Sequence, residues 1–262
     1  MTIVKPFQRS WSRRRFFGGL ALSLLGLSKS VQAMGQSGTF SVRRLATGKQ
    51  PASVERDSGL ARWSWELMRR TSAPARMTAN IVSAASPELL DEPFVLWSGS
   101  GDIEPLLPAE RRGIEAFLRL GGILVVDDAH PESGNFSRAA RRELRRVVPE
   151  SPVTTLESTH VLFKSFYLLK RPYGRVVGTE RVDAIVRGST AQVLFLPCDL
   201  LGALASKPDG SFRFETEPSG KRQRELSIRF AVNIAMYVLC SDYKDDQVHA
   251  PWLMRRRARW QP

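Results

Sequence analysis

The segment that most constrains the fold is GGILVVDDAHPE, residues 121–132. Its four central apolar residues, Ile123 to Val126, follow one another without polar residues between them. That pattern is typical of a strand buried on both faces of a parallel sheet. Such a sheet requires helices on both faces, and the segment therefore predicts an α/β fold. The acidic residues and the histidine after the strand are either the edge of an active site or a turn that caps the next helix.

Amphipathic and apolar segments alternate along the rest of the chain from about Phe40 onward. The spacing of apolar residues predicts helices at 60–71, 108–122, 137–148 and 224–240. Apolar runs predict strands at 40–46, 78–84, 93–101, 123–128, 182–188 and 191–200, with a hairpin around Gly188 joining the last two. The stretch 158–173 stays unassigned, and 202–222 has the Gly, Pro, Ser and Lys content of a long loop. Residues 40–250 contain no repeat and no linker, and are predicted to form a single three-layer α/β domain with a mostly parallel open sheet.

The N-terminus is interpreted as an export signal rather than as part of the domain. Ser12-Arg13-Arg14-Arg15-Phe16-Phe17 resembles the twin-arginine export motif. The apolar stretch 16–27 has only twelve residues, three of them glycine, whereas a spanning helix needs about 20. Small residues predict cleavage after Ala33, so residues 1–33 are expected to direct the protein to the periplasm or envelope. The alternative is an uncleaved basic segment that tethers the protein to the membrane.

Charge and cysteine content exclude some classes of function. The net charge is +13, but residues 1–33 contribute six basic residues and no acidic one, which leaves +7 for the remainder. A surplus of that size without a nucleic-acid motif gives no reason to expect a nucleic-acid partner. Cys198 and Cys240 are too few for a zinc site or a disulfide framework. Two unpaired, buried thiols are expected, and a single bridge between them is the alternative.

Four separated segments together resemble the bacterial family called domain of unknown function 4159. They are GGILVVDDAHPESGNF, THVLFKSFYLL, VLFLPCDL and RELSIRFAVNIAMYVLCSDYKDDQVHAPWLMRRR, and the likeness extends over residues 40–257. The most specific parts are the Gly-Gly, Asp-Asp element and the closing helix with Asn233-x-x-Met236-Tyr237. The chain departs from the family pattern at Val161, because members commonly have Pro after the histidine that matches His160.

The resemblance implies a fold similar to that of class I glutamine amidotransferases, with a flavodoxin-like open sheet. It also implies an envelope protein, of a kind often encoded beside AAA-type ATPases and von Willebrand factor A proteins, so protein partners in the envelope are expected. It implies no established activity, and a fold alone supplies none.

The candidate chemistry lies where the predicted strands end. In open parallel sheets ligands bind at the carboxyl ends of the strands. There the sequence places Asp127, Asp128, His130 and Asp199, with His160 as a further candidate. Carboxylates and imidazole could carry general acid–base chemistry or hold a divalent metal, with Asp128 and His130 as the candidate ligands. The structural alternative is that Asp128 accepts backbone N–H bonds in the turn.

Motifs of known reaction classes are missing from the sequence. A glutaminase needs a cysteine on a sharp strand-to-helix turn beside small residues. Cys198 instead has Pro197 and Asp199 as neighbours, and is expected to fill space at a strand end. No P-loop and no Gly-x-Gly-x-x-Gly segment follows a strand, so no organic cofactor is predicted. Arg224 and Glu225, at the start of the last helix, are expected to pair with Asp199.

The C-terminal segment is the other unusual stretch. Asp242, Asp245, Asp246 and His249 have the chemistry of metal ligands, although an acidic loop after a helix is more often a solvated turn. The tail 251–262 combines four arginines with two tryptophans. That composition suits peripheral contact with a membrane, docking to a partner, or a solvated chain end.

These observations predict an exported α/β protein that serves as a binding or scaffolding module in the envelope, with no recognised catalytic motif. The alternative is a metal-dependent hydrolase that uses Asp127, Asp128 and His130, with His160 and Asp199 as further groups.

Overall fold

The computed structural model describes residues 39–48 and 54–248, with side chains at 39–48 and 55–241. The chain falls into two compact units, Met1–Gln32 and Ala33–Pro262, and the described residues belong to the second. The predicted export signal with Arg13 and Arg14, the tail 251–262 and His249 lie outside the described residues. Of the acidic group after Ser241, only the backbone is described.

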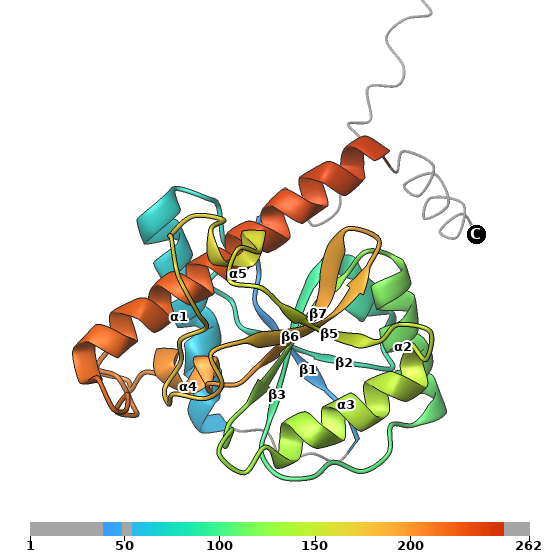
Figure 1. The fold of residues 1–262 in the computed structure, drawn as a ribbon, viewed down its shortest axis with the longest axis horizontal. Coiled ribbons are helices and arrows are strands. Elements are labelled where there is room, and N and C mark those ends of the chain that lie inside the picture. Colours follow the sequence, from blue (N-terminus) through green and yellow to red (C-terminus); the bar gives the residue numbers. More distant parts are fainter. Residues whose placement is uncertain (1–38, 49–53, 249–262) are drawn as a thin grey trace, which may run out of the picture. The chain divides into compact units, whose positions relative to one another are not determined.

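The described residues form a seven-stranded sheet with the order β2-β1-β3-β4-β7-β6-β5 (Figure 1). The strands are β1 (Arg43–Ala46), β2 (Asn80–Ser83), β3 (Phe94–Gly99), β4 (Ile123–Asp128), β5 (Val153–Leu156), β6 (Val182–Arg187) and β7 (Thr190–Leu196). Spatial neighbours from β2 across to β7 pair in parallel, whereas β6 is antiparallel to β7 and to β5. The predicted mostly parallel sheet is confirmed, and its first four strands have the 2-1-3-4 order of flavodoxin-like sheets.

Strand β4 lies in the parallel part of the sheet. It pairs with β3 from Ile123 to Asp128 and with β7 from Leu124 to Asp127, and all its residues are buried. Ile123 and Val125 belong to the core on one face, and Leu124 and Val126 to the core on the other. Successive side chains of a strand point to opposite faces, so the uninterrupted apolar run fills both cores, as the sequence predicts.

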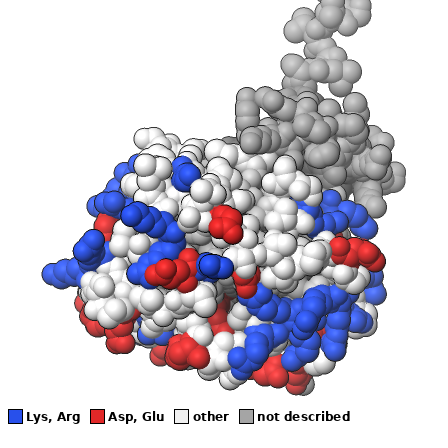
Figure 2. Space-filling model, in the orientation of Figure 1, with Lys and Arg blue, Asp and Glu red and all other residues white. Residues whose placement is uncertain are grey.

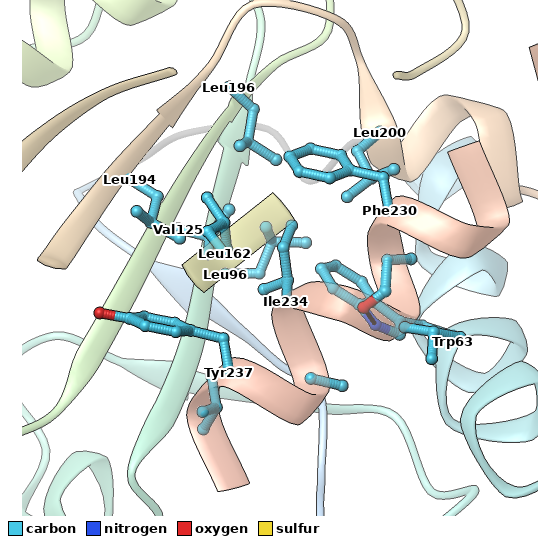
Figure 3. Packing of buried hydrophobic residues seen from close by; sticks show 14 of the residues in the cluster. Trp63, Leu96, Val125, Leu162, Leu194, Leu196, Leu200, Phe230, Ile234 and Tyr237 are labelled. Atoms are coloured by element: carbon cyan, nitrogen blue, oxygen red, sulfur yellow. Dashed lines mark hydrogen bonds between the residues drawn. The ribbon is translucent and has the colours of Figure 1, made fainter. Parts of the chain in front are cut away.

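Helices cover both faces of the sheet (Figure 1). On one face α1 (Val54–Thr71), α4 (Leu200–Leu204) and α5 (Gly220–Val248) pack against one another; on the other lie α2 (Pro108–Arg119) and α3 (Asn135–Val147). Figure 3 shows Trp63, Phe230 and Ile234 of the helices beside Leu96 and Val125 of the sheet. The three-layer α/β domain is therefore confirmed. Among the described helices, none is long and apolar enough to cross a membrane.

A few elements differ from the sequence prediction. Helix α1 begins at Val54, six residues before the predicted start, and the sequence pattern missed the edge strand β5, whose VTTL residues are mostly polar or exposed. Helix α4 occupies the end of the predicted strand and the start of the predicted loop. Its five residues are all buried, so it has no amphipathic pattern to detect. Two short 3₁₀ helices, η2 (Pro87–Asp91) and η3 (Val161–Phe163), complete the described elements, and η3 lies in the stretch left unassigned.

Candidate functional site

The carboxyl ends of β4 and β7 bring Asp127 and Asp199 together in the interior, where both side chains are fully buried. Asp127 accepts hydrogen bonds from the backbone N–H groups of Leu200 and Leu201, at 2.8 and 2.7 Å. Asp199 accepts from the N–H of Gly202 at 3.0 Å. The first N–H groups of a helix have no partner inside it, and in α4 these three are satisfied by carboxylate oxygens.

The turn into α4 has an unusual backbone. Asp199 has φ +50° and ψ 64°, in the left-handed region that residues other than glycine rarely adopt. Gly202 is required three residues later, because a Cβ there would lie 2.3 Å from Oδ2 of Asp199. Gly174 lies against the carbonyl oxygen of Cys198, where a Cβ would come within 2.0 Å. The buried carboxylate is therefore enclosed by close backbone contacts.

Two arginines neutralise Asp199. Arg56, in the first turn of α1, donates from Nε and Nη2 to the two carboxylate oxygens, at 3.1 Å each. Arg175, from the irregular segment after η3, donates from Nε to Oδ2. Both guanidinium groups also donate to the carbonyl oxygen of Ala129, at 3.3 and 3.5 Å. The carboxylate thereby joins α1, the end of β7 and the segment around residue 175.

The prediction that Arg224 and Glu225 pair with Asp199 is wrong. Arg224 donates to the carbonyl oxygen of Ala203, near the other end of α4, and Glu225 forms two 2.9 Å hydrogen bonds with Arg70 of α1. The reason is geometric. Arg224 satisfies a carbonyl in the last turn of the short helix whose first turn Asp199 caps.

Burial and the nearby carboxylate of Asp199 raise the pKa of Asp127 to about 8, against the opposing effect of the α4 N–H groups and Arg56. Burial also raises the pKa of the Cys198 thiol well above its ordinary value, and the two carboxylates add to this effect. A thiol in such surroundings stays protonated and is a poor nucleophile. Both guanidinium groups donate to Asp199, so that carboxylate is paired within the protein, whereas Asp127 holds its proton up to about pH 8.

Asp128 acts on the opposite face of the sheet. Its Oδ1 accepts from the N–H of His130 at 2.9 Å, and its Oδ2 accepts from the N–H of Ser137 in the first turn of α3 at 2.8 Å. The residue before α3 is Gly134, which has no side chain to cap the helix. Asp128 supplies the missing acceptor from the end of β4. The two adjacent aspartates thus cap helices on opposite faces.

His130 is set apart from the buried carboxylates. Its side chain is 52% exposed, and its Nδ1 lies 3.5 Å from Oε1 of Glu132, which is also exposed. Its hydrogen bond to Asp128 comes from the backbone N–H and not from the imidazole. Within the described residues, no group of three or more His, Cys, Asp or Glu side chains is placed to hold a metal ion.

His160 lies at the other end of the sheet. Its Nδ1 accepts from the N–H of Leu162, and its ring centroid lies 5.8 Å from that of Tyr237. The Tyr237 hydroxyl accepts from the N–H of Ala191, near the start of β7, whereas Asp199 follows the end of the same strand. Burial lowers the pKa of His160, which agrees with its role as an acceptor. The structure does not bring His160 to the strand-end carboxylates.

Ser98 occupies the position where ligands commonly bind in such sheets. The strand order reverses between β1 and β3, and open α/β sheets bind ligands at that reversal. Ser98, near the end of β3, pairs in register with Asp127; its Oγ is buried and has no hydrogen-bond partner among the described residues. Residues 49–53, which follow β1, are not described.

The two cysteines are unpaired, as expected, but only one is buried. Cys198 is buried in the core, whereas Cys240 is exposed, so the expectation of two buried thiols is wrong for the second. Helix α5 continues to Val248, and its core residues end before Cys240. Asp242, Asp245 and Asp246 therefore lie in the helix, and the expectation of an acidic loop after it is wrong.

The sequence interpretation missed Arg56 and Arg175. Arg56 carries a detectable signal, because a cation in the first turn of a helix opposes the helix dipole and indicates an acidic partner. Arg175 lies in a segment without regular structure, and its partner is 24 residues away in the sequence. Nothing local in the sequence indicates that contact.

Comparison with known proteins identifies a family. A family model described as "Domain of unknown function (DUF4159)" matches residues 41–239, well over half of the chain. No curated protein matches the sequence.

Proposed function

The chain belongs to the family described as Domain of unknown function (DUF4159), and from that premise we propose that it is an exported envelope protein that binds or scaffolds partners without catalysing a reaction at its strand ends. The family description names no activity, so the proposal rests on the residues themselves.

The observation that carries the proposal is that all three strand-end carboxyl groups are buried, and that every one of their oxygens accepts a hydrogen bond from within the domain. Both oxygens of Asp127 cap α4, Asp128 caps α3 with one oxygen and accepts from the turn at His130 with the other, and Asp199 is held by two arginines. A catalytic or metal-binding carboxylate must be reached by its substrate or metal, and these three side chains are buried. These three groups are instead used to hold the three layers of the domain together.

The export signal and the envelope partners remain part of the proposal. Residues 1–33 support a twin-arginine route through Arg13 and Arg14, which would carry the domain across the membrane already folded. A protein without an enzymatic site in that compartment would act through contacts with other envelope components, and protein partners are the expected class.

The test is complementation of a deletion strain with His130→Ala, compared with Glu132→Ala as the control. Both side chains are exposed, so neither change should affect folding. Full complementation by His130→Ala at normal abundance supports the binding role. Loss of complementation with His130→Ala alone would contradict it, because the histidine then has a chemical role that folding does not explain.

Metal analysis addresses the hydrolase alternative directly. The chain from residue 34 onward, prepared without chelators or a histidine tag, is analysed for bound metal and then heated with added Zn²⁺, Mn²⁺ or Mg²⁺. Absence of bound metal together with an unchanged unfolding temperature supports the proposal. About one metal per chain that is lost in Asp128→Ala would overturn it in favour of a metal-dependent hydrolase.

A further inference from the structure

The segment from Val161 to Leu169 exposes apolar side chains although it is firmly anchored. Leu162, Phe163 and Leu169 are buried in the core, and the ring of Phe163 stacks on a phenylalanine of α5. Between these anchors Leu168 is 85% exposed, Val161 54% and Phe166 43%. The apolar exposure is therefore a property of an ordered loop and not of a loose chain end.

Asn233 of α5 holds the exposed part of the loop in place. Its side-chain Oδ1 accepts from the N–H of Tyr167 at 2.7 Å, and its Nδ2 donates to the carbonyl oxygen of the same residue at 2.8 Å. Ser165 donates from its hydroxyl to the backbone carbonyl of Asn233 at 2.7 Å. The N–H of Leu169 donates to the carbonyl oxygen of Phe163 at 2.9 Å and closes the loop. Asn233 is fully buried, so the platform is built from inside the domain.

The platform itself is basic, although Glu157 and Glu180 flank it in the sequence. Residues 161–179 contain four basic residues and no acidic one. Arg171 and Arg175 are paired with Glu180 and Asp199. Lys164 and Lys170 are exposed, and no carboxylate of the described residues pairs with either. The exposed loop thus combines apolar side chains with two available ammonium groups.

A second basic surface lies elsewhere and has different properties. The lysines and arginines of Figure 2 gather most densely at the lower right, where α3 runs, while the region of η3 and the middle of α5 is mostly uncharged. Of the α3 arginines, Arg141, Arg142 and Arg146 already pair with carboxylates. The α3 surface is therefore partly neutralised and has no apolar centre.

We propose that the loop 161–170 docks on an anionic lipid bilayer, with Val161, Phe166 and Leu168 entering the interface and Lys164 and Lys170 contacting the headgroups. Interfacial membrane binding uses this combination of large apolar side chains with basic residues beside them. Protein–protein interfaces are instead depleted in lysine, which favours the lipid as the occupant. The inference uses neither Asp127 nor Asp199, so it does not depend on the absence of catalysis there.

The first experiment measures binding of the chain to phosphatidylcholine vesicles with about one phosphatidylglycerol in three, and to phosphatidylcholine alone. Leu168→Ser with Phe166→Ser is expected to weaken binding about tenfold or more, because two apolar side chains no longer leave water. Lys164→Gln with Lys170→Gln is expected to weaken binding about tenfold on the anionic vesicles only. Leu107→Ser is the matched control, because Leu107, the residue before α2, is also a leucine with an exposed side chain (59%) and lies outside the loop. Its replacement should leave binding unchanged.

The second experiment separates this loop from any other contact with the bilayer. Leu168→Cys and Leu107→Cys are each made in a Cys240→Ser background and labelled with an environment-sensitive fluorophore; the remaining Cys198 is buried. On anionic vesicles the label at position 168 is expected to shift to shorter wavelength and to be quenched by spin-labelled lipid, and the label at position 107 is not. If the protein sediments with vesicles while the label at 168 stays in water, the proposal is overturned. Shielding of that label only by added envelope proteins would also overturn it and assign the loop to a protein partner.

Discussion

Arg56 and Asp199 lie 143 residues apart in the sequence and share two hydrogen bonds of 3.1 Å, from Nε to Oδ1 and from Nη2 to Oδ2. The guanidinium also lies over the ring of Phe214, 4.7 Å from its centroid. The pair connects the first helix of the domain to the turn after β7. It is buried on both sides, so water cannot replace either partner.

Removal of Arg56 should therefore be costly. In Arg56→Ala the carboxylate of Asp199 stays buried with Arg175 as its remaining cation, and the free energy of unfolding is expected to fall by about 3–5 kcal/mol. Arg171→Ala breaks an exposed pair with Glu180 and should change the free energy of unfolding by less than about 1 kcal/mol. Urea denaturation of the two variants measures both values. Equal, small losses of stability in the two variants would show that the burial of Asp199 does not require its pairing with Arg56.

The stability of the protein should depend on the protonation of Asp127. Its pKa is raised from an ordinary value of 3.8 to about 8 in the folded state, because burial and Asp199 disfavour the charged form. The folded state therefore binds this proton more tightly than the unfolded state. The stabilising contribution is complete below the unfolded pKa and is lost as pH rises through the folded value. Wild type should lose unfolding free energy between about pH 4 and pH 8 relative to Asp127→Asn.

Asp209→Asn is the control for that titration. The exposed carboxyl of Asp209 has a lowered pKa, because Ser211 donates hydrogen bonds to it. Its replacement should therefore change the pH dependence of the unfolding free energy only in more acidic solution. Parallel pH profiles for wild type and Asp127→Asn would show that Asp127 is ionised throughout and that the arginines outweigh its burial.

Asp128 should contribute as a cap and not as a ligand. Asp128→Ala removes both N–H acceptors and is expected to destabilise the protein by about 1–2 kcal/mol, with no effect of added divalent metal on the difference. Asp128→Asn keeps one acceptor oxygen and should recover part of the loss. Thermal unfolding with and without Zn²⁺ or Mn²⁺ measures this. A metal-dependent difference between wild type and Asp128→Ala would assign the residue to a metal site.

The two thiols should react very differently. Cys240 is exposed and Cys198 is buried with a raised pKa, so a thiol reagent should modify one thiol in the native protein and two in denaturant. Cys240→Ser should leave no reactive thiol until the protein unfolds. Rapid modification of Cys198 in the native state would mean that the turn between β7 and α4 opens readily.

The export prediction is tested apart from the domain. A reporter fused to residues 1–40 should lose export when Arg13 and Arg14 are both replaced by lysine, since the twin-arginine motif requires the guanidinium pair. Arg15→Lys, at the variable position of the motif, is the matched control and should still be exported. Export that survives the double replacement would contradict the twin-arginine assignment.

Much of the fold could be predicted because its signals are local. The apolar run of β4, the Gly121 stop after α2 with φ +87° and the hairpin turn at Gly188 with φ +62° each follow from a few adjacent residues. Helix α4 could not be predicted, because all of its residues are buried and carry no period. Strand β5 at the sheet edge is short and polar, and is defined by its pairing with β6 and not by its own composition.

The candidate site could be predicted only in part. The sequence placed Asp127 and Asp199 at strand ends, and the sheet brings them together as the ends of neighbouring strands must. The same rule could not separate Asp127 from Asp128, whose side chains point to opposite faces. It also could not supply Arg56 and Arg175, because each is distant from Asp199 in the sequence and their contacts depend on how the layers pack.

Asp127 and Asp128, which cap helices on opposite faces, also make a shifted register of β4 unfavourable. A slip of β4 by one residue against β3 or β7 exchanges the two faces, so Asp127 would turn toward the layer of α3 and Asp128 toward that of α4. Both helices would then lose their caps in the same event, at about 1 kcal/mol each, together with the burial of the strand's apolar side chains. A shifted register is therefore unfavourable in both helical layers at once. Only in the native register can both layers pack against the sheet.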